Sequence, residues 1–140
     1  MVHALQEIRR VLAPGGILID LRPVGDTWPV ELVTGRETRE AGRVSDLPLG
    51  REDDAAANSA MERAAEDRLF RRVQEEFFPF HYYWDSPSEM QEYVEEEWQD
   101  FISIDEPVWK SIRSLWAVAN ADARLRVRVK MLIARWQRLE

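Results

Sequence analysis

The chain has 140 residues, the length of one small domain, and a formal net charge of −7, so we expect no general affinity for nucleic acid or for anionic membranes. It has no cysteine, which excludes disulfides, cysteine-ligated zinc and thiol catalysis. No apolar run is long enough to span a membrane and no secretory signal is visible, so a cytoplasmic domain is expected.

The N-terminal stretch predicts a helix, a tight turn and a strand. Residues Val2 to Leu12 carry apolar side chains at helical spacing, and Pro14-Gly15-Gly16 ends the helix because proline cannot continue it and glycine accepts positive φ. The following "ILIDLRP" is rich in β-formers and ends at Pro23. Its three successive apolar residues predict burial on both faces, as in a parallel sheet covered by helices.

Residues 24–76 are interpreted as an insertion. Scattered glycine and proline with few periodic apolar residues indicate a long loop or a weakly ordered segment over residues 24–58. A capping box, Ser59-Ala-Met-Glu62, then predicts a helix that continues to about Glu76. Its expected apolar stripe comprises Ala57, Met61, Ala65, Leu69 and Val73.

The C-terminal part predicts two helices and two further strands. "FFPFHYYW", residues 77–84, is aromatic and β-prone, and Ser86-Pro87-Ser88-Glu89 is a second capping box that opens a helix. A short strand, "FISI", is expected at 101–104, and another helix begins at Pro107. Residues 124–136 would suit a helix too, but their strict apolar–basic alternation and β-branched content favour a strand.

Charge is unevenly distributed along the C-terminal part. Residues 85–106 contain nine acidic and no basic residues, whereas residues 124–138 contain six basic and no acidic residues. We expect these two segments to face each other or a symmetry mate. The basic stripe beside tryptophans could also be a platform for single-stranded nucleic acid, but the acidic total disfavours this alternative.

This order of elements resembles the C-terminal half of a class I S-adenosylmethionine-dependent methyltransferase. In that family an Arg-Val-Leu-x-Pro-Gly-Gly motif leads into the fifth strand, and here Arg10-Val11-Leu12-Ala13-Pro14-Gly15-Gly16 leads into "ILIDL". "SPSEMQEYVEEEW" matches the next helix, "FISI" the sixth strand, and "LRVRVKMLIARW" the seventh, which runs antiparallel between the fifth and sixth. The resemblance implies an α/β fold with a partial Rossmann-like sheet of about three strands, mixed in direction and flanked by helices, in a single domain of residues 1–140.

The family's cofactor-binding residues have no counterpart here. The resemblance implies a glycine-rich turn after the first strand and an acidic residue ending the second, yet none of the six glycines forms Gly-x-Gly. The implied chemistry is methyl transfer from S-adenosylmethionine to an unidentified small molecule. We expect this chain alone to bind no cofactor and to be inactive, either because Met1 is an internal methionine of a longer protein or because a natural half-protein assembles with something else.

A strand built for burial that lacks its neighbour invites pairing with another chain. We therefore expect a homodimer through the edge strand Ile17 to Leu21, without nucleic acid or membrane as a partner. The alternative function is a non-enzymatic oligomerisation or interaction module that retains only the scaffold.

The candidate substrate-binding residues are His81, Tyr82, Tyr83 and Trp84, because aromatic rings beside a histidine can hold a small molecule. The alternative is that these aromatic residues pack on the sheet, as half-buried tyrosine and tryptophan commonly do, and this alternative is favoured. No catalytic residue is assigned. No metal site is expected, because His3 and His81 are the two histidines and the runs Asp53-Asp54 and Glu95-Glu96-Glu97 indicate solvated surfaces.

Overall fold

The computed structural model describes residues 2–140, which form two compact units. Among these residues, unit 1 comprises residues 2–24, Glu52–Phe78 and Met131–Glu140, and unit 2 comprises Gly25–Arg51 and Pro79–Lys130. The described residues contain four α-helices, a five-stranded sheet and a two-stranded sheet, so the chain is α/β with more than the three strands expected. The strand pairs with an assigned register are all antiparallel, so no parallel Rossmann-like arrangement is seen.

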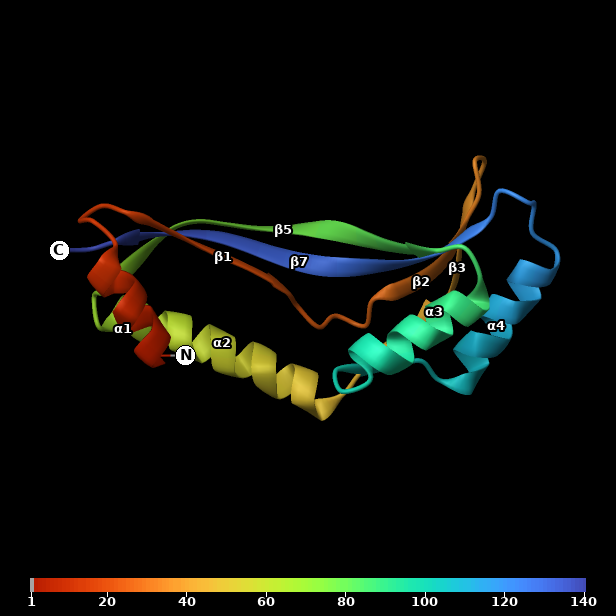
Figure 1. Ribbon diagram of the computed structural model, residues 1–140, viewed down its shortest axis with the longest axis horizontal. Coiled ribbons are helices and arrows are strands. Elements are labelled where there is room, and N and C mark those ends of the chain that lie inside the picture. The colour runs from red at the N-terminus through yellow and green to blue at the C-terminus, as the bar shows by residue number, and fades with distance from the viewer. Residues whose placement is uncertain (1) are drawn as a thin grey trace. The chain divides into compact units, whose positions relative to one another are not determined.

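Unit 1 begins with the predicted helix, turn and strand. Helix α1 (Val2–Val11) ends before the Pro-Gly-Gly turn, and strand β1 (Ile17–Pro23) follows, so these predictions are confirmed. Gly15 has a φ of +76°, a conformation that favours glycine. Strand β1 pairs antiparallel with residues 131–137 of strand β7 (Arg124–Arg138), so the first and last strands of the chain are neighbours (Figure 1).

Strand β1 is covered on one face alone, so the expected burial on both faces is wrong. Ile17, Ile19 and Leu21 are 43%, 50% and 55% exposed, while the residues between them are half-buried. Helices α1 and α2 (Pro48–Glu66) lie on the same side of the unit 1 strands in Figure 1. A run of apolar residues therefore does not signal two-sided burial here, because the strand is antiparallel to its partner and one face lacks a covering helix.

Helix α2 differs from the predicted one at both ends. It begins at Pro48, so Ser59 lies inside it and is not an N-cap, and it ends at Glu66. Arg68 then adopts a φ of +57°, and strand β5 (Phe70–Trp84) occupies the residues expected to continue the helix. The buried face of α2 consists of Ala57, Ala60, Met61 and Ala64, while Ala65 is exposed.

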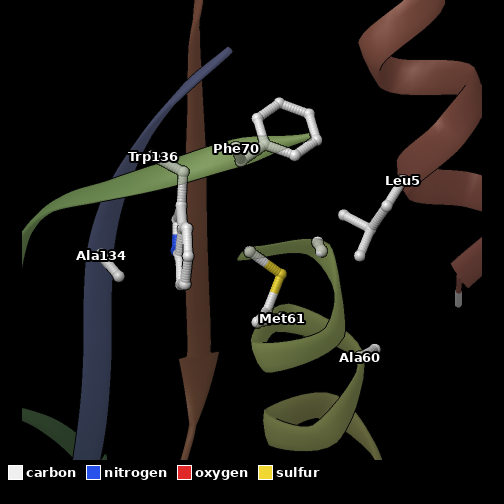
Figure 2. Close-up of a cluster of buried hydrophobic side chains, with 7 residues drawn as sticks. Leu5, Ala60, Met61, Phe70, Ala134 and Trp136 are labelled. Carbon is white, nitrogen blue, oxygen red and sulfur yellow. The ribbon is translucent and has the colours of Figure 1, made fainter. Parts of the chain in front are cut away.

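The core of unit 1 joins the helices to the strands (Figure 2). Leu5 of α1 and Met61 of α2 pack with Phe70 of β5 and with Ala134 and Trp136 of β7. Phe70 is 1% exposed and Ala134 is also 1% exposed. Burial of one large apolar side chain of this kind contributes about 1.5–3 kcal/mol, so a few such residues account for much of a small domain's stability.

Unit 2 contains a β-hairpin where a loop was expected. Strands β2 (Pro29–Val33) and β3 (Thr38–Arg43) are antiparallel, and the amide of Thr34 donates to the carbonyl of Glu37 across the turn. Strand β2 also pairs with residues 124–127 of β7. The interpretation of residues 24–58 as a loop or a weakly ordered segment is therefore wrong, because backbone pairing supplies the order that local apolar periodicity does not show.

A short strand is present within residues 101–104, but it pairs with a different strand from the one expected. Strand β6 (Ile102–Ser103) pairs with β4 (Ser45–Asp46) in the separate two-stranded sheet. The strand that pairs with β7, in addition to β1 and β2, is β5. The expectation that 101–104 flanks the last strand is therefore wrong.

The second capping box and the helices after it are confirmed. The amide of Glu89 donates to the Ser86 hydroxyl 3.2 Å away, and helix α3 (Pro87–Tyr93) starts at a proline. A π-helical turn (Val94–Trp98) extends it, and α4 (Glu106–Ala117) buries Ile112. Met90 and Val94 are buried, and Tyr93 and Trp98 are half-buried.

Substituting Phe70 tests the unit 1 core. Phe70→Ala removes a side chain that is 1% exposed and leaves a cavity beside Met61, so we expect a loss of about 3–5 kcal/mol in unfolding free energy. Phe78→Ala on the same strand is the matched control, because Phe78 is exposed, and it should cost less than about 1 kcal/mol. Urea unfolding followed by circular dichroism measures both. Equal losses would contradict this core assignment.

Candidate functional site

The candidate stretch His81-Tyr82-Tyr83-Trp84 lies at the end of β5, in unit 2. Successive side chains of a strand point to opposite faces of its sheet. The four residues are therefore divided: Tyr82 and Trp84 contact one set of partners, and His81 and Tyr83 contact another. The structure does not bring the four together as one site.

Tyr82 and Trp84 belong to an aromatic cluster. The ring centroid of Trp98 lies 5.0 Å from that of Tyr82 and 5.8 Å from that of Trp84. The ring centroid of Tyr93 lies 5.5 Å from that of Trp84, and the centroid of Trp28, the residue before β2, lies 5.6 Å from that of Trp98. Desolvation by burial, followed by the influence of Tyr82, raises the pKa of Tyr93. These contacts fit the packing alternative for Tyr82 and Trp84.

His81 and Tyr83 lie among charged side chains. The guanidinium carbon of Arg124 is 4.7 Å from the centroid of the Tyr83 ring, and that of Arg126 is 6.0 Å from it. The two rings of His81 and Tyr83 meet edge to face at 6.1 Å. Arg124 also pairs with Asp85 at 3.1 Å. A cation over an aromatic face is attracted by the ring quadrupole, so Tyr83 and Arg124 hold each other in place.

Glu31 anchors this charged face. It is the one buried charged residue among residues 2–140, and the β2–β7 register places it opposite Arg126. Its Oε1 lies 3.0 Å from Nη2 of Arg126 and 3.7 Å from Nε of Arg128. A carboxylate removed from water needs such partners, because desolvation of an unpaired charge costs several kcal/mol.

The surroundings of His81 on this face favour its neutral form more than water favours the neutral form of a free histidine. Burial and the cationic Arg126 lower the pKa of His81, Glu31 partly opposes them, and Arg128 lowers it further. Burial alone would lower the pKa of Arg126, but hydrogen bonding to Tyr83 and the Glu31 carboxylate outweigh it and raise that pKa. The face therefore combines permanent guanidinium charges with an imidazole that can gain a proton.

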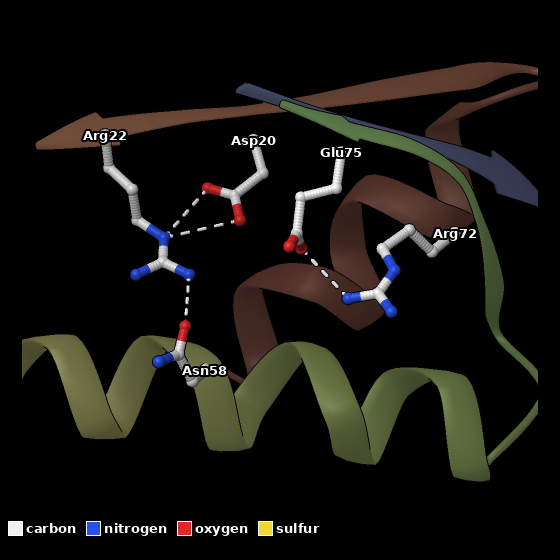
Figure 3. Close-up of polar contacts among 5 residues, drawn as sticks. All are labelled: Asp20, Arg22, Asn58, Arg72 and Glu75. Atoms are coloured by element: carbon white, nitrogen blue, oxygen red, sulfur yellow. Dashed lines mark hydrogen bonds and ion pairs between the residues drawn. The ribbon is translucent and has the colours of Figure 1, made fainter. Parts of the chain in front are cut away.

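A second polar cluster lies in unit 1, between β1 and α2 (Figure 3). Asp20 accepts from Nε of Arg22 at 3.2 Å, and Asn58 of α2 accepts from Nη2 of the same arginine at 2.6 Å. Arg72 pairs with Glu75 on β5 at 2.9 Å. Asp20 and Arg22 form an ion pair with each other, and Arg22 also donates to Asn58. The cluster therefore connects β1 to α2 and presents no reactive group of its own.

Comparison with known proteins gives no relationship. No family model, no curated protein and no solved structure was found to match the chain. Within residues 2–140 no helix has the length and apolar character needed to cross a membrane. The same residues include no group of three or more metal-ligating histidine, cysteine, aspartate or glutamate side chains.

Sequence reasoning did not find Glu31. The signal was present, since "PVELV" places one acidic residue in a short apolar run, and a strand there buries it. The sequence shows the partner arginines only as a basic stripe, because their pairing with Glu31 depends on β2, where the sequence predicts a loop. His3 is exposed on α1 and takes no part in the charged face.

The pKa of His81 should report this arrangement. We expect it below the ordinary value of 6.5; Arg126→Gln should raise it by removing a cation, and Glu31→Gln should lower it further by removing an anion. Because unfolding restores the ordinary pKa, the unfolded state binds more protons, and stability should fall as pH falls through 6.5 toward the folded pKa. Proton NMR of the imidazole C–H measures the pKa, with His3 as internal reference. A fall of the His81 pKa in Arg126→Gln, or a rise in Glu31→Gln, would refute the assignment.

Proposed function

We propose that the chain is the C-terminal, acceptor-side part of a cytoplasmic class I S-adenosylmethionine-dependent methyltransferase, with a partial Rossmann-like sheet. The observation that carries the proposal is the succession of α1, the Pro14-Gly15-Gly16 turn and β1, with β1 antiparallel to the last strand of the chain. That pairing is the one the family resemblance implies between its fifth and seventh strands.

The residues present do not fit the methyl donor. A cofactor cradle needs glycine amides that are free to approach the ligand. Here the adjacent glycines are already used, because the amide of Gly15 donates to the carbonyl of Arg138 and that of Gly16 to the carbonyl of Ala13. These residues therefore support no catalytic step through S-adenosylmethionine. The role proposed for this chain is contact with the methyl acceptor.

His81 and Tyr83 are the acceptor-contacting residues in this proposal. Tyr83 offers a partly exposed ring, and the neighbouring guanidinium groups offer hydrogen-bond donors. Arg126, which pairs with Glu31, lies 6.0 Å from the centroid of the Tyr83 ring, and this pairing suits a binding surface that must hold a small molecule in one orientation. Tyr82 and Trp84 support this surface from the opposite face through the aromatic cluster.

Two measurements test the methyltransferase proposal. The reading frame upstream of the Met1 codon should encode a strand followed by Gly-x-Gly, and calorimetric titration of S-adenosylmethionine into the 140-residue chain should give no saturable heat. A chain extended by the upstream residues should bind the cofactor. Absence of any such frame would contradict the proposal, and saturable binding by the 140-residue chain would contradict its assignment of the cofactor site.

A second candidate function, an interaction module, is favoured by the outer face of β1. Ile17, Ile19 and Leu21 are exposed in a row, and no further strand among residues 2–140 pairs with the outer edge of β1. An exposed apolar strand with free backbone groups is a template for pairing. We propose a second copy of this chain as the occupant, since one edge can meet its own symmetry mate in a closed two-fold arrangement.

Ile19→Asp tests the dimer. A carboxylate in the middle of the apolar row should convert a dimer to a monomer, measured by light scattering at several protein concentrations. Val118→Asp is the matched control, because Val118 is also an exposed aliphatic residue but lies in unit 2. A monomeric parent chain, or equal masses for the two variants, would overturn the proposal.

A further inference from the structure

The charged face of unit 2 has one cation more than it has carboxylates. Three of its cations each have a carboxylate of their own: Arg124 with Asp85, Lys130 with Asp26, and Arg43 with Glu40, which the β2–β3 register places opposite Glu31. Arg126 and Arg128 share the single carboxylate of Glu31. The five cations therefore face four carboxylates.

The surplus charge belongs to Arg128. Arg126 lies closer to Glu31, at 3.0 Å, and its side chain is 15% exposed, whereas Arg128 approaches the same oxygen only to 3.7 Å and is 45% exposed. Within residues 2–140 no hydrogen bond is assigned to the terminal nitrogens of Arg128. Its guanidinium fork therefore remains available, and this fork matches the two oxygens of a carboxylate.

His81 and Tyr83 lie on the same face as this fork. Tyr83 contacts Arg124 and Arg126, and side chains alternate along a strand. His81, two residues from Tyr83 on β5, and Arg128, two residues from Arg126 on β7, therefore lie on that same face. Arg126 and Arg128 also lower the pKa of His81. Tyr83 is 39% exposed and already carries the guanidinium of Arg124 over its ring. Cationic, aromatic and titratable groups thus converge on one open sheet face.

We propose that this face binds a small carboxylic acid, whose carboxylate pairs with Arg128 beside His81 and Tyr83. A monovalent carboxylate restores the charge balance, and the pairing repeats chemistry that Glu31 already shows with Arg126. This inference rests on the proposed function only for the role of the ligand, because it names the chemical class of the methyl acceptor. Binding itself requires neither the cofactor nor turnover.

Benzoate is the probe, because it stays singly charged over the pH range in which histidine titrates. A bound carboxylate should raise the pKa of His81, and the imidazole signal in proton NMR reports this rise. Sodium chloride at the same ionic strength is the control for screening of the arginine charges. We expect a saturable rise for His81 with benzoate beyond that with chloride.

Arg128→Gln and Arg135→Gln separate the site from general charge effects. Arg128→Gln should raise the His81 pKa without benzoate, since a cation is lost, and should weaken benzoate binding roughly tenfold or more. Arg135→Gln removes an exposed arginine of the same strand in unit 1 and should leave the benzoate response unchanged.

Equal benzoate binding by the two variants, or a rise of the His81 pKa with benzoate no larger than with chloride, would overturn the inference. Because no cofactor is added, such a failure leaves the methyltransferase proposal to its own test, the upstream reading frame. If no such reading frame exists but benzoate still binds, the face binds a carboxylic acid that is not a methyl acceptor.

Discussion

The alternation of side chains along β7 is the constraint on which both units depend. Strands β1, β2 and β5 all pair with it. In unit 2 its odd-numbered residues are buried, with Leu125 and Val127 fully inaccessible, whereas in unit 1 the even-numbered Leu132, Ala134 and Trp136 are buried. Because a strand has a period of two, the residues that build the core of unit 2 force the intervening arginines onto the opposite face. Core and charged face are thus two consequences of one pattern.

The burial of Glu31 on the charged face has a free-energy cost of desolvation. A buried ion pair is weak evidence for stability, because desolvation offsets much of the attraction between its two charges. What Glu31 adds is position: it fixes Arg126 against Tyr83 and leaves Arg128 less tightly held. A carboxylate that orders one guanidinium and leaves another available is consistent with a binding surface.

Local signals predicted the parts of the fold that local physics determines. Helix α1, the Pro-Gly-Gly turn, β1 and the Ser86 capping box follow from residue types that act within a few positions of themselves. The end of α2 did not, because Leu69 and Val73 continue the helical spacing by coincidence, while Arg68 leaves the helical conformation and β5 pairs with β7. The β2–β3 hairpin was missed for the same reason, since its order comes from residues nearly one hundred positions away. For the site, the sequence predicts the stretch of β5 and the basic stripe of β7 separately, and Glu31, which pairs with that stripe, follows only from the hairpin.

The tetrapeptide at the end of β5 combines two roles that sequence alone presents as alternatives. The sequence treats His81 to Trp84 as one group that either binds or packs, but a strand directs successive side chains to different faces. Tyr82 and Trp84 meet Tyr93 and Trp98, whose contacts are those of a core. His81 and Tyr83 meet ionised groups, which suit a solvent-facing surface. The packing of one pair therefore holds the other pair in place, so the question of site or core has a separate answer for each residue.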